Sequence, residues 1–111
     1  MKRKKLHITE EKYPVQVAEF KKILNSLFEL HLQKNAEYSP ANIKVLGQLG
    51  VSLRLMEKII RALNLQGFSA LDGKLVDKPK VVRYGSVEEE LKDIATLAII
   101  AMILPTGHWG K

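Results

Sequence analysis

The sequence contains no cysteine, which excludes disulfide bonds and any site that depends on a thiolate as metal ligand or nucleophile. Aromatic residues are scarce, at 6% of the chain, but apolar residues make up 46% of its 111 positions. This apolar content suffices for one modest core, so we expect a single domain over residues 1–111.

The longest apolar run, residues 94–104, is too short to span a bilayer. No signal peptide is visible, because no apolar segment follows the basic start. We therefore expect a cytoplasmic protein.

Charge of one sign dominates the composition. Lysine and arginine number 18 against 12 acidic residues, which gives a formal net charge of +6. Such an excess suits a polyanionic partner, namely a nucleotide, a nucleic acid or an anionic surface. Part of the charge lies in residues 1–5, and we expect residues 1–13 to form a flexible, extended basic N-terminus.

Three segments show helical periodicity. The first is predicted at 14–36, with Pro14 as its first residue; its apolar stripe is wider than about 100° and contains Phe20, Ile23, Leu24, Leu27, Phe28 and Leu30. After a short helical turn at 41–46, the second should run from Gln48 or Val51 to Asn64. Its apolar residues share one face: Leu49, Leu53, Met56, Ile59, Ile60 and Leu63.

The third helix is predicted to start at Ser86, which forms a capping box with Glu89. It is apolar almost all round over 94–104 and ends at Pro105 and Gly107. Between the second and third helices, residues 66–85 lack periodicity and are expected as a long loop, with weak ribbon pairing of 75–76 and 81–82 as an alternative.

The fold class predicted from these segments is all-α. We expect a bundle of three long helices with short extra helices and one long loop. So thin a bundle leaves apolar surface uncovered on the third helix, and we therefore expect a homodimer or homotetramer to complete it.

Two carboxylates mark a candidate metal site. Glu90 and Asp93 are three residues apart and are predicted to face inward at the polar end of the third helix. Inward carboxylates offer the hard oxygen ligands that Mg²⁺ or Mn²⁺ prefers. The simpler alternative is an acidic first turn that stabilises the helix dipole. Basic residues that could bind phosphates lie on the second helix: Arg54, Lys58 and Arg61.

A polar stretch ends the first helix. One row of this helix is predicted to face the core: Phe20, Leu24, Leu27 and His31. Lys34 and Asn35 lie one turn beyond this row, so their side chains should point in the same direction. We expect a nucleotide-binding rim here, formed by Lys34, Asn35, Glu37, Tyr38 and Asn42. The alternative is an ordinary helix end followed by a turn.

A different interpretation of residues 41–63 is a helix-turn-helix. A short helix, a G-V-S turn and a helix carrying Arg54, Lys58 and Arg61 would suit the major groove of DNA. Against it, the first helix is barely two turns long, and Glu57 would lie among the groove-facing residues.

Four segments together resemble the MazG-like, all-α nucleotide pyrophosphohydrolase superfamily, and most closely its branch of nucleotide-modification-associated proteins. They are K-N-A-E-Y-S-P-A-N-I, G-V-S-L-R-L-M-E-K-I-I-R-A-L-N-L, S-V-E-E-E-L-K-D-I-A-T-L-A-I-I and H-W-G-K. They cover residues 32–65 and 86–111. In that superfamily, E-E-x-x-E on one helix and E-x-x-D on the next bind Mg²⁺ and direct water onto a triphosphate.

The resemblance implies Mg²⁺-dependent binding of a nucleoside triphosphate and its hydrolysis to the monophosphate and pyrophosphate. Glu57, Glu90 and Asp93 would be the catalytic metal ligands, Lys34, Arg54 and Arg61 would hold phosphates, and Glu37 would position water or ribose. This sequence departs from the superfamily in the first motif, where only Glu57 remains, and at Thr96 and Leu97, where the branch has an N-Y pair. Two alternatives stay open: a non-catalytic protein of this type that binds a nucleotide or a protein partner, and the DNA-binding interpretation.

Overall fold

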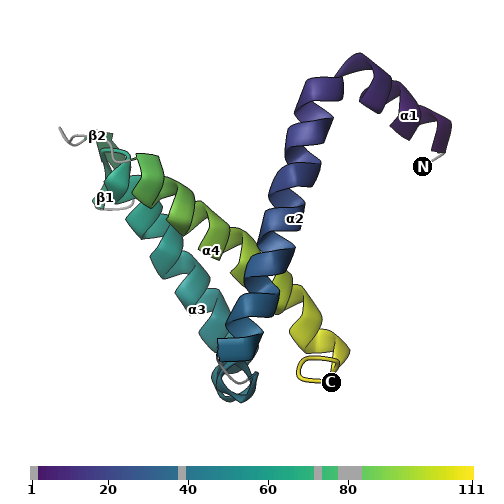
Figure 1. Ribbon diagram of the computed structural model, residues 1–111. Coiled ribbons are helices and arrows are strands. Elements are labelled where there is room, and N and C mark those ends of the chain that lie inside the picture. The colour runs from purple at the N-terminus through teal and green to yellow at the C-terminus, as the bar shows by residue number, and fades with distance from the viewer. Residues whose placement is uncertain (1–2, 38–39, 72–73, 78–83) are drawn as a thin grey trace. The chain divides into compact units, whose positions relative to one another are not determined.

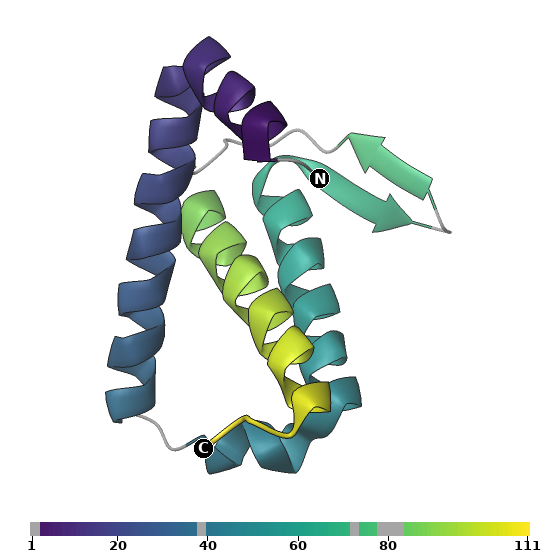
Figure 2. The same cartoon turned by 90° about the vertical axis from the view of Figure 1, so that its right-hand side faces the viewer.

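The computed structural model describes residues 3–37, 40–71, 74–77 and 84–111, and Figures 1 and 2 show it in two orientations. The chain divides into two compact units, Met1–Ala36 and Glu37–Lys111, which are described separately. The predicted all-α class is confirmed, since long helices form most of the described chain and the strands form one short hairpin.

The first unit contains two helices, α1 (Arg3–Lys12) and α2 (Pro14–Glu37), which meet at an angle at Tyr13 (Figure 1). Pro14 explains the bend, because its ring nitrogen cannot donate the next helical hydrogen bond. The extended chain expected for residues 1–13 is wrong over α1. This segment consists largely of arginine, lysine, leucine and glutamate, which favour helix, and His7 Nδ1 lies 3.6 Å from Glu10 Oε2 one turn on.

Helix α2 confirms the predicted helix, including its start at Pro14. Most of its apolar stripe is exposed; Phe20, for example, keeps 66% of its surface accessible, whereas Leu27 is buried. The inward row predicted for this helix is therefore covered only in part.

The second unit begins with α3 (Ala41–Leu65), which is two helical segments joined at Gly47. The break confirms the predicted short turn at 41–46 and the helix that follows it. Gly47 has φ 68° and ψ −174°, a backbone conformation that is essentially restricted to glycine. A glycine therefore fixes the point at which the chain changes direction.

Gly47→Ala is expected to lower the free energy of unfolding by about 1–3 kcal/mol, which is the cost of holding alanine in this conformation. Steric crowding is not the cause, because a Cβ built at Gly47 meets no described atom within 4 Å. Urea denaturation followed by circular dichroism measures the change. Gln48→Ala, at the exposed neighbouring position, is the control and should change stability little. Equal effects of the two substitutions would contradict this account of Gly47.

Strands β1 (Phe68–Leu71) and β2 (Lys74–Asp77) form an antiparallel hairpin after α3. The register pairs Phe68 with Asp77 and Leu71 with Lys74. The sequence analysis expected a loop here, or a ribbon pairing 75–76 with 81–82. The partner of 75–76 is instead 69–70, while 81–82 lies outside the described residues. The signal in the sequence was Asp72-Gly73, a dipeptide typical of two-residue hairpin turns.

Helix α4 (Tyr84–Ile103) is followed by a short 3₁₀ helix, η1 (Leu104–Thr106), and Gly107 then ends the helical path with φ 76°. The predicted end at Pro105 and Gly107 is confirmed. The predicted capping box is wrong, because α4 starts two residues earlier and Ser86 is its third residue rather than its N-cap. A serine–glutamate spacing inside the first turn gives the same sequence pattern as a true capping box.

The core of the second unit lies where α3, α4 and the C-terminal turn meet. Val51, Ile100 and Trp109 form its centre, with Ile43, Leu97, Ala101, Ile103 and Leu104 packed around them. Trp109 keeps only 6% of its surface exposed, and its Nε1 donates a hydrogen bond of 2.9 Å to the Pro40 carbonyl. The C-terminal segment therefore folds back against the start of α3 (Figure 2).

Helix α3 carries apolar side chains on two nearly opposite faces. One face has Val51, Leu55 and Ala62, with the charged Lys58 completing a 4-3-4 spacing. On this face Val51 packs with Ile100 and Trp109, and Lys58 pairs with Asp93 on α4. Leu49, Leu53, Met56 and Ile60 repeat the same spacing roughly 160° away around the helix. The sequence analysis grouped this second set correctly on one face, but the face is exposed: Leu49 keeps 73% of its surface accessible.

Candidate functional site: an ion-pair network between α3 and α4

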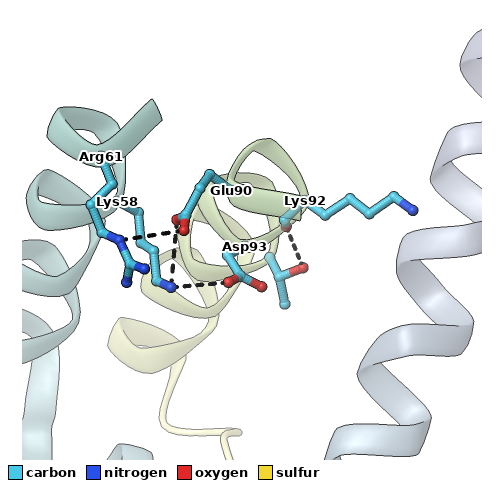
Figure 3. A network of polar contacts seen from close by, with 6 residues as sticks. Lys58, Arg61, Glu90, Lys92 and Asp93 are labelled. Carbon is cyan, nitrogen blue, oxygen red and sulfur yellow. Dashed lines mark hydrogen bonds and ion pairs between the residues drawn. The ribbon is translucent and has the colours of Figure 1, made fainter. Parts of the chain in front are cut away.

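Four charged side chains meet between α3 and α4, which lie side by side in both views (Figures 1 and 2). Lys58 and Arg61 come from α3, and Glu90 and Asp93 come from α4 (Figure 3). Lys58 Nζ lies 3.2 Å from Asp93 Oδ2 and 3.5 Å from Glu90 Oε2. Arg61 Nε lies 3.5 Å from Glu90 Oε1. We call these four residues the ion-pair network.

Helical spacing explains why these residues meet. Lys58 and Arg61 are three residues apart, as are Glu90 and Asp93, so each pair projects from neighbouring turns of its helix. Two such pairs on packed helices place each carboxylate beside a cation. On the α4 side, Thr96 Oγ1 donates a 2.8 Å hydrogen bond to the carbonyl of Lys92, one turn earlier in the helix.

Glu90 is the most buried member of the network, with 7% of its surface exposed. Its Oε2 atom is itself buried and makes no hydrogen bond to a described residue; the Lys58 ammonium group lies 3.5 Å from it as an ion-pair partner. Lys58 keeps 27% of its side chain exposed and neutralises part of the charge at 3.5 Å. The Arg61 side chain is 65% exposed, so water screens its attraction to Glu90 and leaves its remaining N–H groups accessible to a ligand.

The acidic half of the network has the composition of a magnesium site. Mg²⁺ is typically bound by one or two carboxylates together with water and substrate phosphates. Glu90 and Asp93 supply such a pair, and Glu90 Oε2 is a buried oxygen that makes no hydrogen bond to a described residue and has Lys58 Nζ 3.5 Å away. A metal ion in place of this ammonium group would compensate the charge of that oxygen, so the two carboxylates fit the metal that the sequence analysis expected.

The third expected metal ligand lies apart from this pair. Glu57 is exposed, and the described residues contain no group of three or more histidine, aspartate or glutamate side chains suited to a metal. The reason is angular: Glu57 precedes Lys58 by one position, which turns it about 100° away from the face that meets α4. Lys58 and not Glu57 therefore faces the acidic pair.

The structure places the other predicted residues as follows. Arg54 is exposed on α3, and Asn42 is exposed near its start. Lys34 and Asn35 are exposed on α2, in the other unit, where Asn35 Nδ2 lies 3.4 Å from His31 Nε2. Glu37 is the last residue of α2, and Tyr38 lies outside the described residues.

Sequence reasoning identified all four members of the network but missed how they pair. It assigned Lys58 and Arg61 to phosphates and the carboxylates to a metal, whereas the structure joins the two sets. The signal was present as K-x-x-R on one helix and E-x-x-D on the next, which are complementary at the same spacing. The pairing also turns Lys58 toward α4, away from the surface that a helix-turn-helix would present to DNA.

Comparison with known proteins adds no relative. The chain matches no protein-family model, and neither a curated protein nor a solved structure is significantly similar to it. Among the described helices, none combines the length and the apolar character that a membrane span requires.

Proposed function

We propose that this chain binds a nucleoside triphosphate as its Mg²⁺ complex at the ion-pair network. The observation that supports the proposal is the meeting of two carboxylates and two cations within 3.2–3.5 Å, with Glu90 Oε2 buried and making no hydrogen bond to a described residue. Carboxylates that hold a metal and cations that hold phosphates are the two components that a nucleotide site requires.

The residues divide between two roles in this proposal. Glu90 and Asp93 bind the metal through their oxygens, while Lys58 and Arg61 contact the phosphates. Arg54 is exposed one turn before Lys58 on the same helix and would contact a ligand that extends beyond the network. When bound, Mg²⁺ would neutralise phosphate charge and favour attack by water, so hydrolysis to the monophosphate and pyrophosphate is the reaction that we propose for the site. The contributions of Glu57, Lys34, Asn35, Glu37, Tyr38 and Asn42 stay predictions.

A nucleotide screen tests this function. We expect Mg²⁺ together with at least one nucleoside triphosphate to raise the melting temperature, because a ligand that binds only the folded state stabilises it. The same mixtures assayed for pyrophosphate show whether hydrolysis follows binding. Failure of every triphosphate to raise the melting temperature would contradict the proposal. Salt-sensitive binding of duplex DNA in its place would favour the helix-turn-helix interpretation.

Asp93→Asn is expected to weaken Mg²⁺-dependent triphosphate binding at least tenfold, because the substitution keeps the side-chain shape and removes one carboxylate charge. Calorimetric titration of the Mg²⁺–triphosphate complex measures the change. Glu88→Gln is the matched control: Glu88 lies on the same helix and pairs with a lysine, Lys92, at 3.7 Å, but it lies outside the network. Equal losses in the two variants would assign the effect to general charge and not to the site.

A second candidate function is the binding of a protein partner without catalysis. The exposed row Leu49, Leu53, Met56 and Ile60 favours it, since contiguous apolar surface on a soluble helix usually marks an interface. Both functions can coexist, because the row and the ion-pair network occupy different faces of α3.

A further inference from the structure

The ion-pair network contains its own cation at the place where a metal would be expected. Lys58 Nζ approaches one oxygen of each acidic side chain, at 3.2 Å from Asp93 and 3.5 Å from Glu90. In Figure 3 the ammonium group lies between the two carboxylates, and both dashed lines converge on it. A divalent ion held by these two oxygens, Asp93 Oδ2 and Glu90 Oε2, would compete with the ammonium group for the same space.

We infer that Lys58 competes with the metal, and that a Mg²⁺–triphosphate binds by moving the Lys58 ammonium from the carboxylates onto the phosphates. The inference rests on the proposed function and specifies how its site is controlled. Free Mg²⁺ offers Lys58 no replacement for the two charges that it would lose. A triphosphate offers such a replacement, so metal and nucleotide enter together and the acidic pair stays closed to metal alone.

The surroundings of Lys58 support such an exchange. Its side chain is 27% exposed, so the ammonium group has a route to solvent along a flexible four-carbon chain. Its contact with Glu90 is an ion pair at 3.5 Å and leaves the buried Oε2 atom without a hydrogen bond from any described residue. Lys58 therefore compensates the charge of Glu90 incompletely, so a metal ion that binds this oxygen more strongly can displace the ammonium group.

The test uses Mn²⁺ alone, so that it needs no nucleotide. The full chain is titrated with Mn²⁺, and the bound fraction is read from the loss of the electron paramagnetic resonance signal of the free ion. Lys58→Met keeps the length of the side chain and removes its charge. We expect Mn²⁺ affinity to rise at least tenfold over wild type, and Mn²⁺ to raise the melting temperature of the variant but not of wild type.

Two further variants assign the effect to the site. Lys92→Met removes the lysine of a solvent-exposed ion pair with Glu88 on α4 and should bind Mn²⁺ as wild type does. Adding Asp93→Asn to Lys58→Met should abolish the gain. If the methionine variant does not fold, Lys58→Gln provides the same comparison with a neutral side chain that can still donate a hydrogen bond to Glu90.

The outcomes separate this inference from the proposed function. Unchanged Mn²⁺ affinity in the folded Lys58 variant overturns the inference, as does tight Mn²⁺ binding by wild type without nucleotide; neither result bears on whether triphosphates bind. Conversely, a gain of Mn²⁺ affinity in the variant supports competition by Lys58 even if wild type binds none of the triphosphates screened. In that case the proposed function would fall, and the network would be a metal site kept closed by its own lysine.

Discussion

Replacing Trp109 by alanine is expected to destabilise the unit Glu37–Lys111 by about 3–5 kcal/mol, the usual cost of removing a buried large aromatic side chain. Trp109 lies in the centre of the core beside Val51 and Ile100, and its Nε1 bonds the Pro40 carbonyl. The substitution therefore removes apolar contact and leaves a cavity where the C-terminal turn meets α3. Urea denaturation followed by far-ultraviolet circular dichroism measures the loss; fluorescence is unsuitable, because Trp109 is the only tryptophan.

Trp109→Phe separates packing from hydrogen bonding. Phenylalanine keeps much of the apolar surface but has no N–H to offer Pro40, so its expected cost is about 1–2 kcal/mol. A loss for alanine as small as that for phenylalanine would mean that the turn is held by the hydrogen bond and not by the core. A clearly larger loss of stability for alanine than for phenylalanine supports a turn held mainly by the packing of Trp109 in the core.

The second large effect is expected on the oligomeric state. Leu53→Gln together with Met56→Gln should convert a self-associating protein into a monomer, because both residues lie in the middle of the exposed apolar row on α3. Glutamine resembles leucine and methionine in helix propensity, so the helix itself should be little affected. Sedimentation equilibrium at micromolar concentration gives the mass of wild type and variant.

Arg54→Gln together with Glu57→Gln is the matched control, since it places two glutamines on the polar flank of the same helix. This control should keep the wild-type mass. If wild type is monomeric at these concentrations, the apolar row is not covered by a second copy of this chain. A mass unchanged by the Leu53 and Met56 substitutions would place the interface elsewhere, for example on the exposed side of α2.

The sequence predicted the long helices well because each depends on local periodicity. Pro14, the break before Gln48 and the end at Gly107 are set by residues whose backbone preferences act at their own position. The predicted ribbon was wrong because 75–76 pairs with 69–70. The Asp-Gly dipeptide between the two strands, which is typical of two-residue hairpins, favours this closer partner. Residues 3–12 were missed because charge was given more weight than helix propensity.

The site shows where such prediction ends. Helical spacing brought Glu90 and Asp93 to one side of α4 and correctly predicted that Glu90 faces inward. It could not say which side of α3 faces that pair, since α3 carries apolar residues at helical spacing on two faces, one of which also includes Lys58. Only the packing of α3 on α4 decides which face is buried, and it directs Lys58 toward Glu90 and Asp93 and Glu57 away from them. Glu57 could be a metal ligand only if the other face of α3 packed against α4.

The bond between Trp109 and Pro40 also bears on how the protein is made. It joins residues 69 positions apart, and the same tryptophan completes the core around Val51. A ribosome releases the chain from its N-terminus, so α3 is synthesised long before the residue that closes its core. During that interval the apolar side chains on both faces of α3 are open to solvent. Chaperones or a second nascent copy would meet this segment first, and we expect the unit Glu37–Lys111 to fold only after Trp109 has been synthesised.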